Sequence, residues 1–500
     1  MEIAICAARR QGRPVGLFTM LAICTMMRRH SRPARGVHMR PTLERIDRSQ
    51  RIPASYNQEE RILTAAASHT QNNIVTLGLH LHGGVTADAL AVALDRLVAR
   101  HDALRLTFSV DTEGARLHVA NTPAVGFAVR SVESLAPTKR FAHGLAVLAE
   151  EASAPFDVTT GPLIRAGLVR LCDTEHLIGI AVDHMIIDGR SSEILLRDLL
   201  ALLRRARGGP EVDLPDLPVQ FPDWAVWERR YLTGAVHERL SAYWRTALEG
   251  ITALPASGLA DPACDRRPIG VRTQRLTFDG DVWARLTATA RTLRVSPFTM
   301  LSAVLKAAVY RRRRLRQPDD VASDVTVFGA VANRSEQALD DAVGYFSNSA
   351  VMRTDVSGDP GLDELVHRES RMLLSAMAHG DLPHPLVARE VSPELYGIRF
   401  RPGAEVPQYL NFDMPKTRPA GPFSIDGLRA DIVGIPVVEL PRSGLRLIAH
   451  PLLDGVRIDA RYRTDRFTGT WIASLLSDYR RLVVAWTEKP AARLSAIAAE

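Results

Sequence analysis

The stretch EHLIGIAVDHMIIDGRSSEILLRDLLALLRRA, residues 175–206, sets the pattern for the whole chain. Its apolar run, which ends at Asp183 and His184, is typical of a buried strand. From about Ser192 the apolar residues recur at helical spacing, which predicts an amphipathic helix. The segment between must turn from strand to helix, and a strand followed closely by a helix is the repeating unit of α/β folds.

The same rhythm of strands and helices continues on both sides of this stretch. Upstream, TLGLHLHG (76–83) alternates with period two, and Thr86 stands where the cap of the next helix belongs. Downstream, a second α/β pattern starts near residue 270. The chain of 500 residues is also longer than one hydrophobic core usually organises. We therefore predict two α/β lobes.

The boundary between the lobes is predicted from a stretch rich in proline. Residues 207–222 contain four prolines and two glycines, a composition typical of a connection. We accordingly expect an N-terminal lobe over residues 41–215 and a C-terminal lobe over residues 216–500.

The net charge of the chain lies entirely in its first forty residues. The chain carries +7 at neutral pH, and residues 1–40 hold eight arginines and one acid, so the rest sums to zero. This balance argues against nucleic acid as a partner of the globular body. We expect residues 1–40 to be a disordered leader or to precede the true start near Met39. Their apolar run is too short to span a bilayer, so no membrane partner is expected.

The cysteines indicate a reducing environment. The chain has four of them, Cys6, Cys24, Cys172 and Cys264, and no C-x-x-C pair. This pattern predicts neither a disulfide framework nor a zinc site and fits a cytoplasmic protein.

His184 is the candidate for chemistry in the turn after the strand. A histidine held there can act as a general base, and the carboxylate of Asp188 could orient it or shape the loop through an ion pair. Gly189 allows an unusual backbone angle or close approach of a substrate. A structural histidine is the competing interpretation. Metal binding is disfavoured because His184 and Asp188 share a face only on a helix. A serine nucleophile is disfavoured because Ser191 and Ser192 stand where a helix cap belongs.

Further short motifs occur in a fixed order around this turn, from about residue 50 to about residue 490. Together with DHMIIDG (183–189) they resemble the condensation domains of non-ribosomal peptide synthetases, in which this turn carries the motif H-H-x-x-x-D-G. The similar segments are SYNQEERIL (55–63), ARHDALRLTF (99–108), FDVTTGPLIRAGLVRL (156–171), FPDWAVWE (221–228), YWRTALEG (243–250), VGYFSNSAVMRTD (343–355) and AHGDLPHP (378–385).

The resemblance implies a fold and a reaction. The fold would be a V-shaped pair of chloramphenicol-acetyltransferase-like lobes with a central tunnel. Carrier proteins of a synthetase would deliver acyl groups into it on 4'-phosphopantetheine arms, and an amine or alcohol would attack the thioester to form an amide or ester. The resemblance implies no bound cofactor, no metal, a monomer and a place in secondary-metabolite (antibiotic) biosynthesis. A neutral imidazole with a pKa near 6.5 suits removal of the amine proton, which gives His184 the catalytic role.

The resemblance also implies supporting roles in the loop. Asp188 would form an ion pair with an arginine, for which Arg105 is the first candidate and Arg334 the second. Gly189 could bring a backbone N–H close to the developing oxyanion. Asp183 stands where the family has its first histidine, and alternation along a strand points it away from His184, which favours a structural role.

Some features depart from the family pattern and leave other functions open. Asp183, Asp188 and Ser191 also satisfy D-x-x-x-x-D-x-x-S, the motif of heterocyclisation relatives. The family's late motif is not recognisable in residues 386–415, and no adenylation or carrier-protein motif is found. We therefore predict a free-standing condensation enzyme. The alternatives are a heterocyclisation enzyme, a stand-alone polyketide-associated acyltransferase and a catalytically silent domain that recruits a partner enzyme.

Overall fold

The computed structural model describes most of the chain after residue 39. The described residues are 40–68, 74–122, 124–211, 213–250, 270–316, 323–391, 393, 410–414, 423–425, 427–437 and 444–497. Residues Leu43–Glu500 form one compact unit. The predicted leader lies almost entirely outside the described residues, as does much of the segment 386–415.

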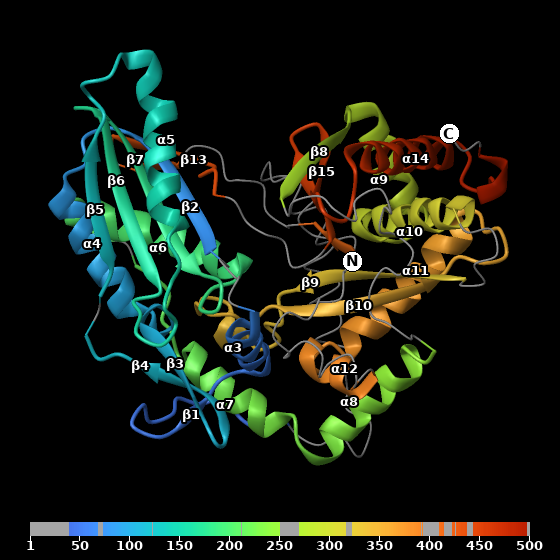
Figure 1. Cartoon of the computed structure of the whole chain (residues 1–500), viewed down its shortest axis with the longest axis horizontal. Coiled ribbons are helices and arrows are strands. Elements are labelled where there is room, and N and C mark those ends of the chain that lie inside the picture. The colour runs from blue at the N-terminus through green and yellow to red at the C-terminus, as the bar shows by residue number, and fades with distance from the viewer. Residues whose placement is uncertain are drawn as a thin grey trace, which may run out of the picture. The chain divides into compact units, whose positions relative to one another are not determined.

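The first lobe is built on a six-stranded sheet with the order β12-β13-β2-β7-β6-β5 (Figure 1). Its strands pair in antiparallel fashion except for β5 and β6, which are parallel. The strands are β2 (Ile74–His82), β5 (Gly126–Ser131), β6 (Ile164–Cys172), β7 (Glu175–Asp183), β12 (Phe423–Ile425) and β13 (Leu428–Val433). Because β12 and β13 lie far downstream in the chain, the first sheet is completed by a segment from the C-terminal half.

Helices cover both faces of this sheet. On one face lies α5 (Pro137–Ser153), which packs Leu148 and Ala152 against Leu177 and its neighbours. On the other face α4 (Ala87–Arg100) and α6 (Gly189–Ala206) lie side by side and bury their apolar stripes in the largest core cluster. The predicted cap of α4 is confirmed, because Thr86 accepts a hydrogen bond from the N–H of Ala89 at 3.2 Å.

A small sheet and two helices adjoin this lobe, and a third helix packs against α12 (His384–Val391) of the second lobe. The sheet has the order β1-β4-β3, and its strands are β1 (Ile52–Pro53), β3 (Leu106–Asp111) and β4 (Gly114–Val119). The helices are α3 (Tyr56–Ser68), α7 (Phe221–Tyr231) and α8 (Gly234–Ala247). In α7 the aromatic residues Phe221, Trp224 and Trp227 are all buried, so the predicted connection, residues 207–222, ends in a residue of the core, Phe221.

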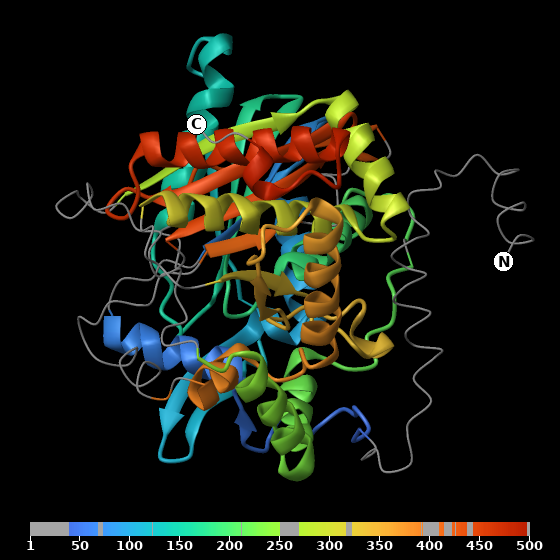
Figure 2. The same ribbon diagram turned by 90° about the vertical axis from the view of Figure 1, so that its right-hand side faces the viewer.

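The second lobe contains another six-stranded sheet, with the order β10-β9-β11-β14-β15-β8. Its strands are β8 (Val271–Phe278), β9 (Asp324–Val331), β10 (Asn348–Asp355), β11 (Leu410–Asp413), β14 (Leu445–Leu452) and β15 (Gly455–Arg463). Its helices are α9 (Gly280–Thr292), α10 (Pro297–Arg316), α11 (Leu362–Ala378), α12 (His384–Val391) and α14 (Gly469–Glu488). Figure 2 shows α14 and α10 running alongside each other over this sheet, where they share a second apolar core.

The fold class predicted from the sequence is confirmed: the chain forms two α/β lobes, each with a six-stranded sheet. The division at residue 215 stays a prediction, and the structure adds that β12 and β13 pair with the first sheet.

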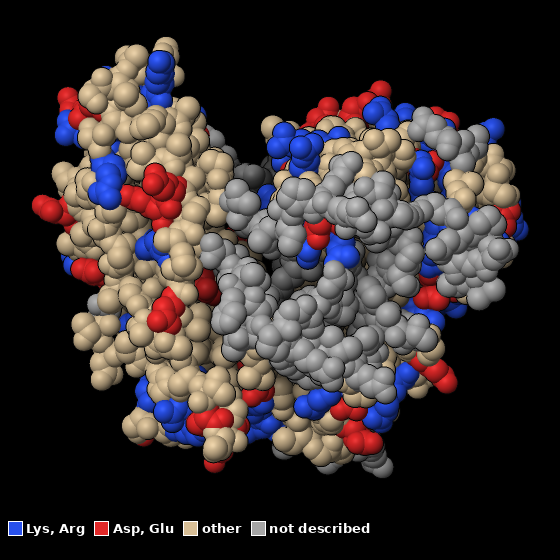
Figure 3. Space-filling view, in the orientation of Figure 1, with Lys and Arg blue, Asp and Glu red and all other residues tan. Residues whose placement is uncertain are grey.

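Several arginines of the run 311–316, at the end of α10, form bonds within the second lobe. Arg311 and Arg312 both pair with the buried carboxylate of Asp478, and Arg313 donates to the carbonyl oxygen of Asp324 at 2.9 Å. These bonds give the arginine run a structural role. Figure 3 shows acidic and basic side chains interspersed over the face in view.

Candidate active site

The turn after β7 is held in place by its backbone. Asp183 ends the strand, and its N–H donates to the carbonyl oxygen of Leu163 at 2.9 Å. The N–H of Ile186 then donates to the carbonyl oxygen of Asp183 at 3.1 Å, which closes the turn. The side-chain amide of Gln58 donates to the carbonyl oxygen of Met185 at 2.7 Å. Since Met185, Ile186 and Ile187 are buried, this turn is fixed by the core beneath it.

Asp188 is the cap of helix α6. Its Oδ1 accepts a hydrogen bond from the backbone N–H of Ser191 at 2.8 Å, and its Oδ2 accepts from the N–H of Phe346 at 3.2 Å. The sequence-based expectation that a serine caps this helix is therefore wrong, since the helix begins at Gly189, before either serine. Asp188 is only 1% exposed, and a carboxylate so buried needs several donors.

The ion pair of Asp188 is made by Arg334. Nη2 of Arg334 lies 3.2 Å from Oδ1 of Asp188, and both side chains are buried. Arg334 also donates to the carbonyl oxygens of Leu339 at 2.5 Å and Ala342 at 2.7 Å, and its guanidinium stacks 4.2 Å from the ring centre of Phe346. Burial lowers the pKa of Arg334 from its usual value, and the charge of Asp188 opposes that shift.

Arg105, the first candidate for this ion pair, pairs elsewhere, so that ranking was wrong. Its Nη2 lies 2.6 Å from Oδ1 of Asp102, and its Nη1 donates to the carbonyl oxygen of Ala120. Asp102 and Arg105 stand three residues apart in a turn of 3₁₀ helix, where positions i and i+3 lie above each other. Arg105 is therefore satisfied by a partner close in sequence.

Ser191 is fully engaged within the loop. Its Oγ lies 2.8 Å from Oδ1 of Asp188 and 2.9 Å from the carbonyl oxygen of Gly344. It also accepts from the N–H of Gly344 at 3.0 Å and from Arg334 at 2.9 Å. Because Ser191 is completely buried, a role as nucleophile is excluded on geometry.

Asp183 makes a local hydrogen bond of the kind expected for a structural residue. Its Oδ1 accepts from the N–H of Met185 at 2.8 Å, and the side chain is largely buried. Asp183 also interacts electrostatically with Arg165 on the neighbouring strand β6. These contacts support the turn, while the direction of Asp183 relative to a substrate stays a prediction.

His184 is half-buried and lies against an aromatic residue that the sequence analysis did not single out. Its ring meets that of Tyr345 edge to face, with 5.2 Å between the ring centres. The hydroxyl of Tyr345 accepts from Nε of Arg61 at 2.9 Å. Arg61 and Tyr345 both lie in segments already matched to the family, 55–63 and 343–355. The order of the motifs therefore predicted the two segments, whereas the contacts between these side chains were found only in the folded structure.

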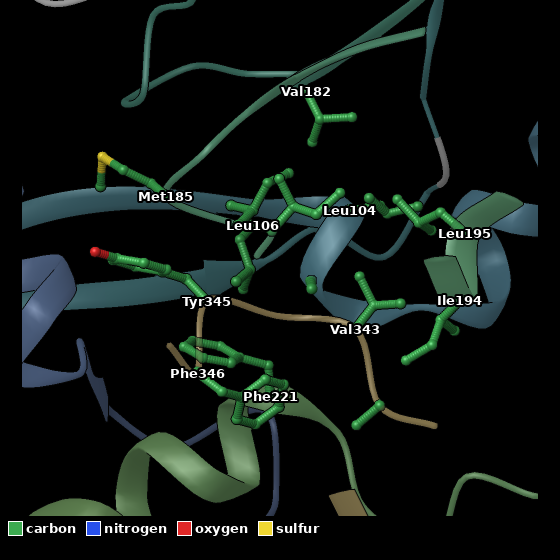
Figure 4. Packing of buried hydrophobic residues seen from close by; sticks show 14 of the residues in the cluster. Leu104, Leu106, Val182, Met185, Ile194, Leu195, Phe221, Val343, Tyr345 and Phe346 are labelled. Carbon is green, nitrogen blue, oxygen red and sulfur yellow. The ribbon is translucent and has the colours of Figure 1, made fainter. Parts of the chain in front are cut away.

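The buried side chains of the turn pack into the largest core cluster. In Figure 4, Met185 and Val182 lie near Leu106 and Leu104, while Tyr345, Phe346 and Phe221 come from two later segments. The ring of Phe346 packs edge to face on Phe221, with 5.1 Å between the ring centres. This packing fixes the segment that supplies hydrogen bonds to Asp188.

Gly189 has an ordinary backbone conformation. Its φ lies outside the left-handed region, so the expectation of an unusual backbone angle is not met. A Cβ at this position would find no heavy atom within 4 Å. The other expectation, that a substrate approaches the backbone here, stays a prediction.

Comparison with known protein families identifies the family of the chain. The family model described as Condensation domain matches residues 48–395. The chain belongs to the condensation-domain family. The resemblance deduced from the motifs is thereby confirmed.

The relatives of this condensation domain are large synthetases. It is 28% identical over 448 residues to a linear gramicidin synthase of Brevibacillus parabrevis, and this match covers 88% of this chain and 8% of the relative. It is 32% identical over 327 residues to phosphinothricin tripeptide synthetase PhsC of Streptomyces viridochromogenes, covering 64% of this chain and 29% of the relative. The chain thus spans less than a tenth of the first relative and under a third of the second.

A solved structure supports the same fold. The chain resembles the X-domain from teicoplanin biosynthesis, solved in complex with OxyB, with a TM-score of 0.76 and 24% identity, covering 93% of this chain and 99% of that one. Within the part of the chain that the structure describes, no helix is both long and apolar enough to cross a membrane.

Proposed function

We propose that this condensation domain joins a carrier-bound acyl group to an amine or alcohol, with His184 as the general base. The observation that carries the proposal is the rigid turn on which His184 sits. The buried Asp188–Arg334 pair and the core beneath hold the turn in one conformation. The turn in this way positions the half-buried side chain of His184. Holding a base in one place is the main structural requirement of such a reaction.

The reaction balances without a bound cofactor. The amine nitrogen attacks the thioester carbonyl carbon, and His184 takes the proton that the nitrogen loses. The C–S bond breaks, and the departing thiolate of the carrier arm receives a proton, so an amide and a free thiol result. The backbone N–H at Gly189 is our candidate donor to the oxyanion, since the space around this residue is open.

The proposal also includes the state of the protein, its location and its substrates. The chain would act free-standing and as a monomer in the cytoplasm, on acyl groups that separate carrier proteins deliver on 4'-phosphopantetheine arms. Its acceptor would be a small amine or alcohol. The family and the similarity to synthetases support only the part played by carrier proteins.

Intact-mass analysis with an acyl-loaded carrier and candidate nucleophiles tests this function. We expect a product equal to acyl group plus nucleophile, and its loss in His184→Ala while the thermal midpoint is kept. His143→Ala, which changes an exposed histidine on α5, is the matched control and should stay active. A fully active His184→Ala variant would refute the assignment of the base.

A second function is favoured by one comparison. The X-domain that this chain resembles was solved in complex with OxyB. If the chain recruits a partner enzyme instead, the same assay would show no acyl transfer with any nucleophile, and His184→Ala would leave partner binding intact. A product that has lost a further water would indicate heterocyclisation.

A further inference from the structure

Four residues with metal-binding side chains meet on three neighbouring strands of the first sheet, at the end of β7 that lies away from the turn. His80 and His82 lie two residues apart on β2, so their side chains share a face. Glu175 of β7 is directly opposite His82 in the sheet, and Asp431 of β13 is directly opposite His80. The strand pairing therefore brings two imidazoles and two carboxylates together.

The distances between these groups suit a bound ion. Nε2 of His80 lies 3.7 Å from one oxygen of Glu175, and Nδ1 of His82 lies 3.8 Å from the other. One donor atom each from His80, His82 and Glu175 lie within 4.8 Å of one another. In a tetrahedral zinc site with bonds of about 2.0–2.1 Å, donor atoms are about 3.3 Å apart. Small side-chain rotations that bring the three donor atoms closer would thus complete the site.

The remaining nitrogen of His82 has the partner that a metal ligand needs. Its Nε2 lies 3.2 Å from Oδ2 of Asp431. A ligating histidine almost always donates its second N–H to a carboxylate or carbonyl, which fixes the tautomer. Arg429 bonds both carboxylate oxygens of Asp431, at 3.1 Å each, and holds it in this orienting position.

We propose that His80 Nε2, His82 Nδ1 and the carboxylate of Glu175 bind a divalent transition metal, of which Zn²⁺ is the probe, and that Asp431 orients His82. Imidazole and carboxylate donors suit zinc, and three protein ligands leave a fourth position for water. The ion would link β2 to β7 directly, and Asp431 of β13 would be coupled to the ion only through His82.

The environment of His80 agrees with this assignment. Its ring packs on that of His82, with 4.1 Å between the ring centres, and on Phe141 of α5 at 5.0 Å. These ring contacts hold the His80 imidazole beside the other proposed ligands.

Competition with a chromophoric chelator tests the site on the full chain. We expect the protein to bind Zn²⁺ at this site and its thermal midpoint to rise with Zn²⁺. His82→Ala should weaken this binding by at least about 100-fold, and Asp431→Asn by about 10- to 100-fold. Co²⁺ should give the visible absorption of a tetrahedral nitrogen–oxygen site, which His82→Ala abolishes.

Two controls keep the test decisive. His367→Ala removes an exposed histidine on α11 in the other lobe and should leave binding unchanged. Glu175→Gln preserves shape and should also bind weakly, with a thermal midpoint in EDTA equal to that of the parent chain. Tight binding that survives in the double variant His80→Ala, His82→Ala would overturn the proposal, as would a parent chain that binds Zn²⁺ only at millimolar concentration.

Discussion

Replacement of Arg334 by alanine should destabilise the protein far more than replacement of Arg105. Arg334 is the cation of a buried pair with Asp188, and it also bonds two backbone carbonyl oxygens. Removing one member of a buried pair typically costs about 3–5 kcal/mol, because the other charge is left buried. The remaining donors to Asp188, the N–H groups of Ser191 and Phe346, place the expected loss near the lower end of that range, at about 3 kcal/mol.

Arg105→Ala is the matched control. The partner of Arg105 is Asp102, which keeps a second cation in Arg48, 2.8 Å away. Both members of the Arg105–Asp102 pair are partly exposed, at 15% and 14%, so we expect a loss of no more than about 1 kcal/mol. The assay is denaturant unfolding of both variants, with acyl transfer measured in parallel.

A double-mutant cycle isolates the pair itself. Arg334→Met and Asp188→Asn should show a coupling free energy of about 1–3 kcal/mol, since the residues are in contact. Activity should fall in both single variants, because the turn that carries His184 loses its anchor. An Arg334→Ala variant no less stable than Arg105→Ala would refute the reasoning that the buried pair holds the turn.

Three further predictions concern the surroundings of the turn. Burial raises the pKa of Glu228 to about 7 from 4.5, so the stability that its protonated form contributes is full below about pH 4.5 and is lost as pH rises through 7. Glu228→Gln should remove this pH dependence of the thermal midpoint and raise the midpoint at pH 8, and an unchanged pH dependence would contradict the raised pKa. Gly344→Ala places a Cβ 2.1 Å from the buried ring of Phe221, so unfolding measurements should show a loss of several kcal/mol, and near-parent stability would argue against this packing. Asp183→His should lower stability by about 1 kcal/mol for the lost bond to Met185 and keep turnover within a few-fold, whereas a large loss of turnover in the mass assay would favour heterocyclisation.

The local features of this protein were predictable from its sequence. The apolar run of β7, the turn and the helical spacing of α6 are set by residues that are neighbours in the chain, so pattern alone located His184 and Asp188 on one short turn. The same holds for the cap at Thr86 and for the α/β class of both lobes. The exact start of α6 was missed, because an aspartate and a serine are both good caps and the choice depends on what else each side chain must bond.

The partners across the fold were decided only by tertiary structure. Two arginines could have paired with Asp188, and the choice of Arg334 over Arg105 rests on which guanidinium the packing delivers to a buried carboxylate. The contact of Tyr345 with His184 and the pairing of β13 with β2 have the same origin. Spacing along the chain determines which helices, strands and turns neighbouring residues can form. Contacts between residues hundreds of positions apart depend instead on how complete sheets and cores assemble.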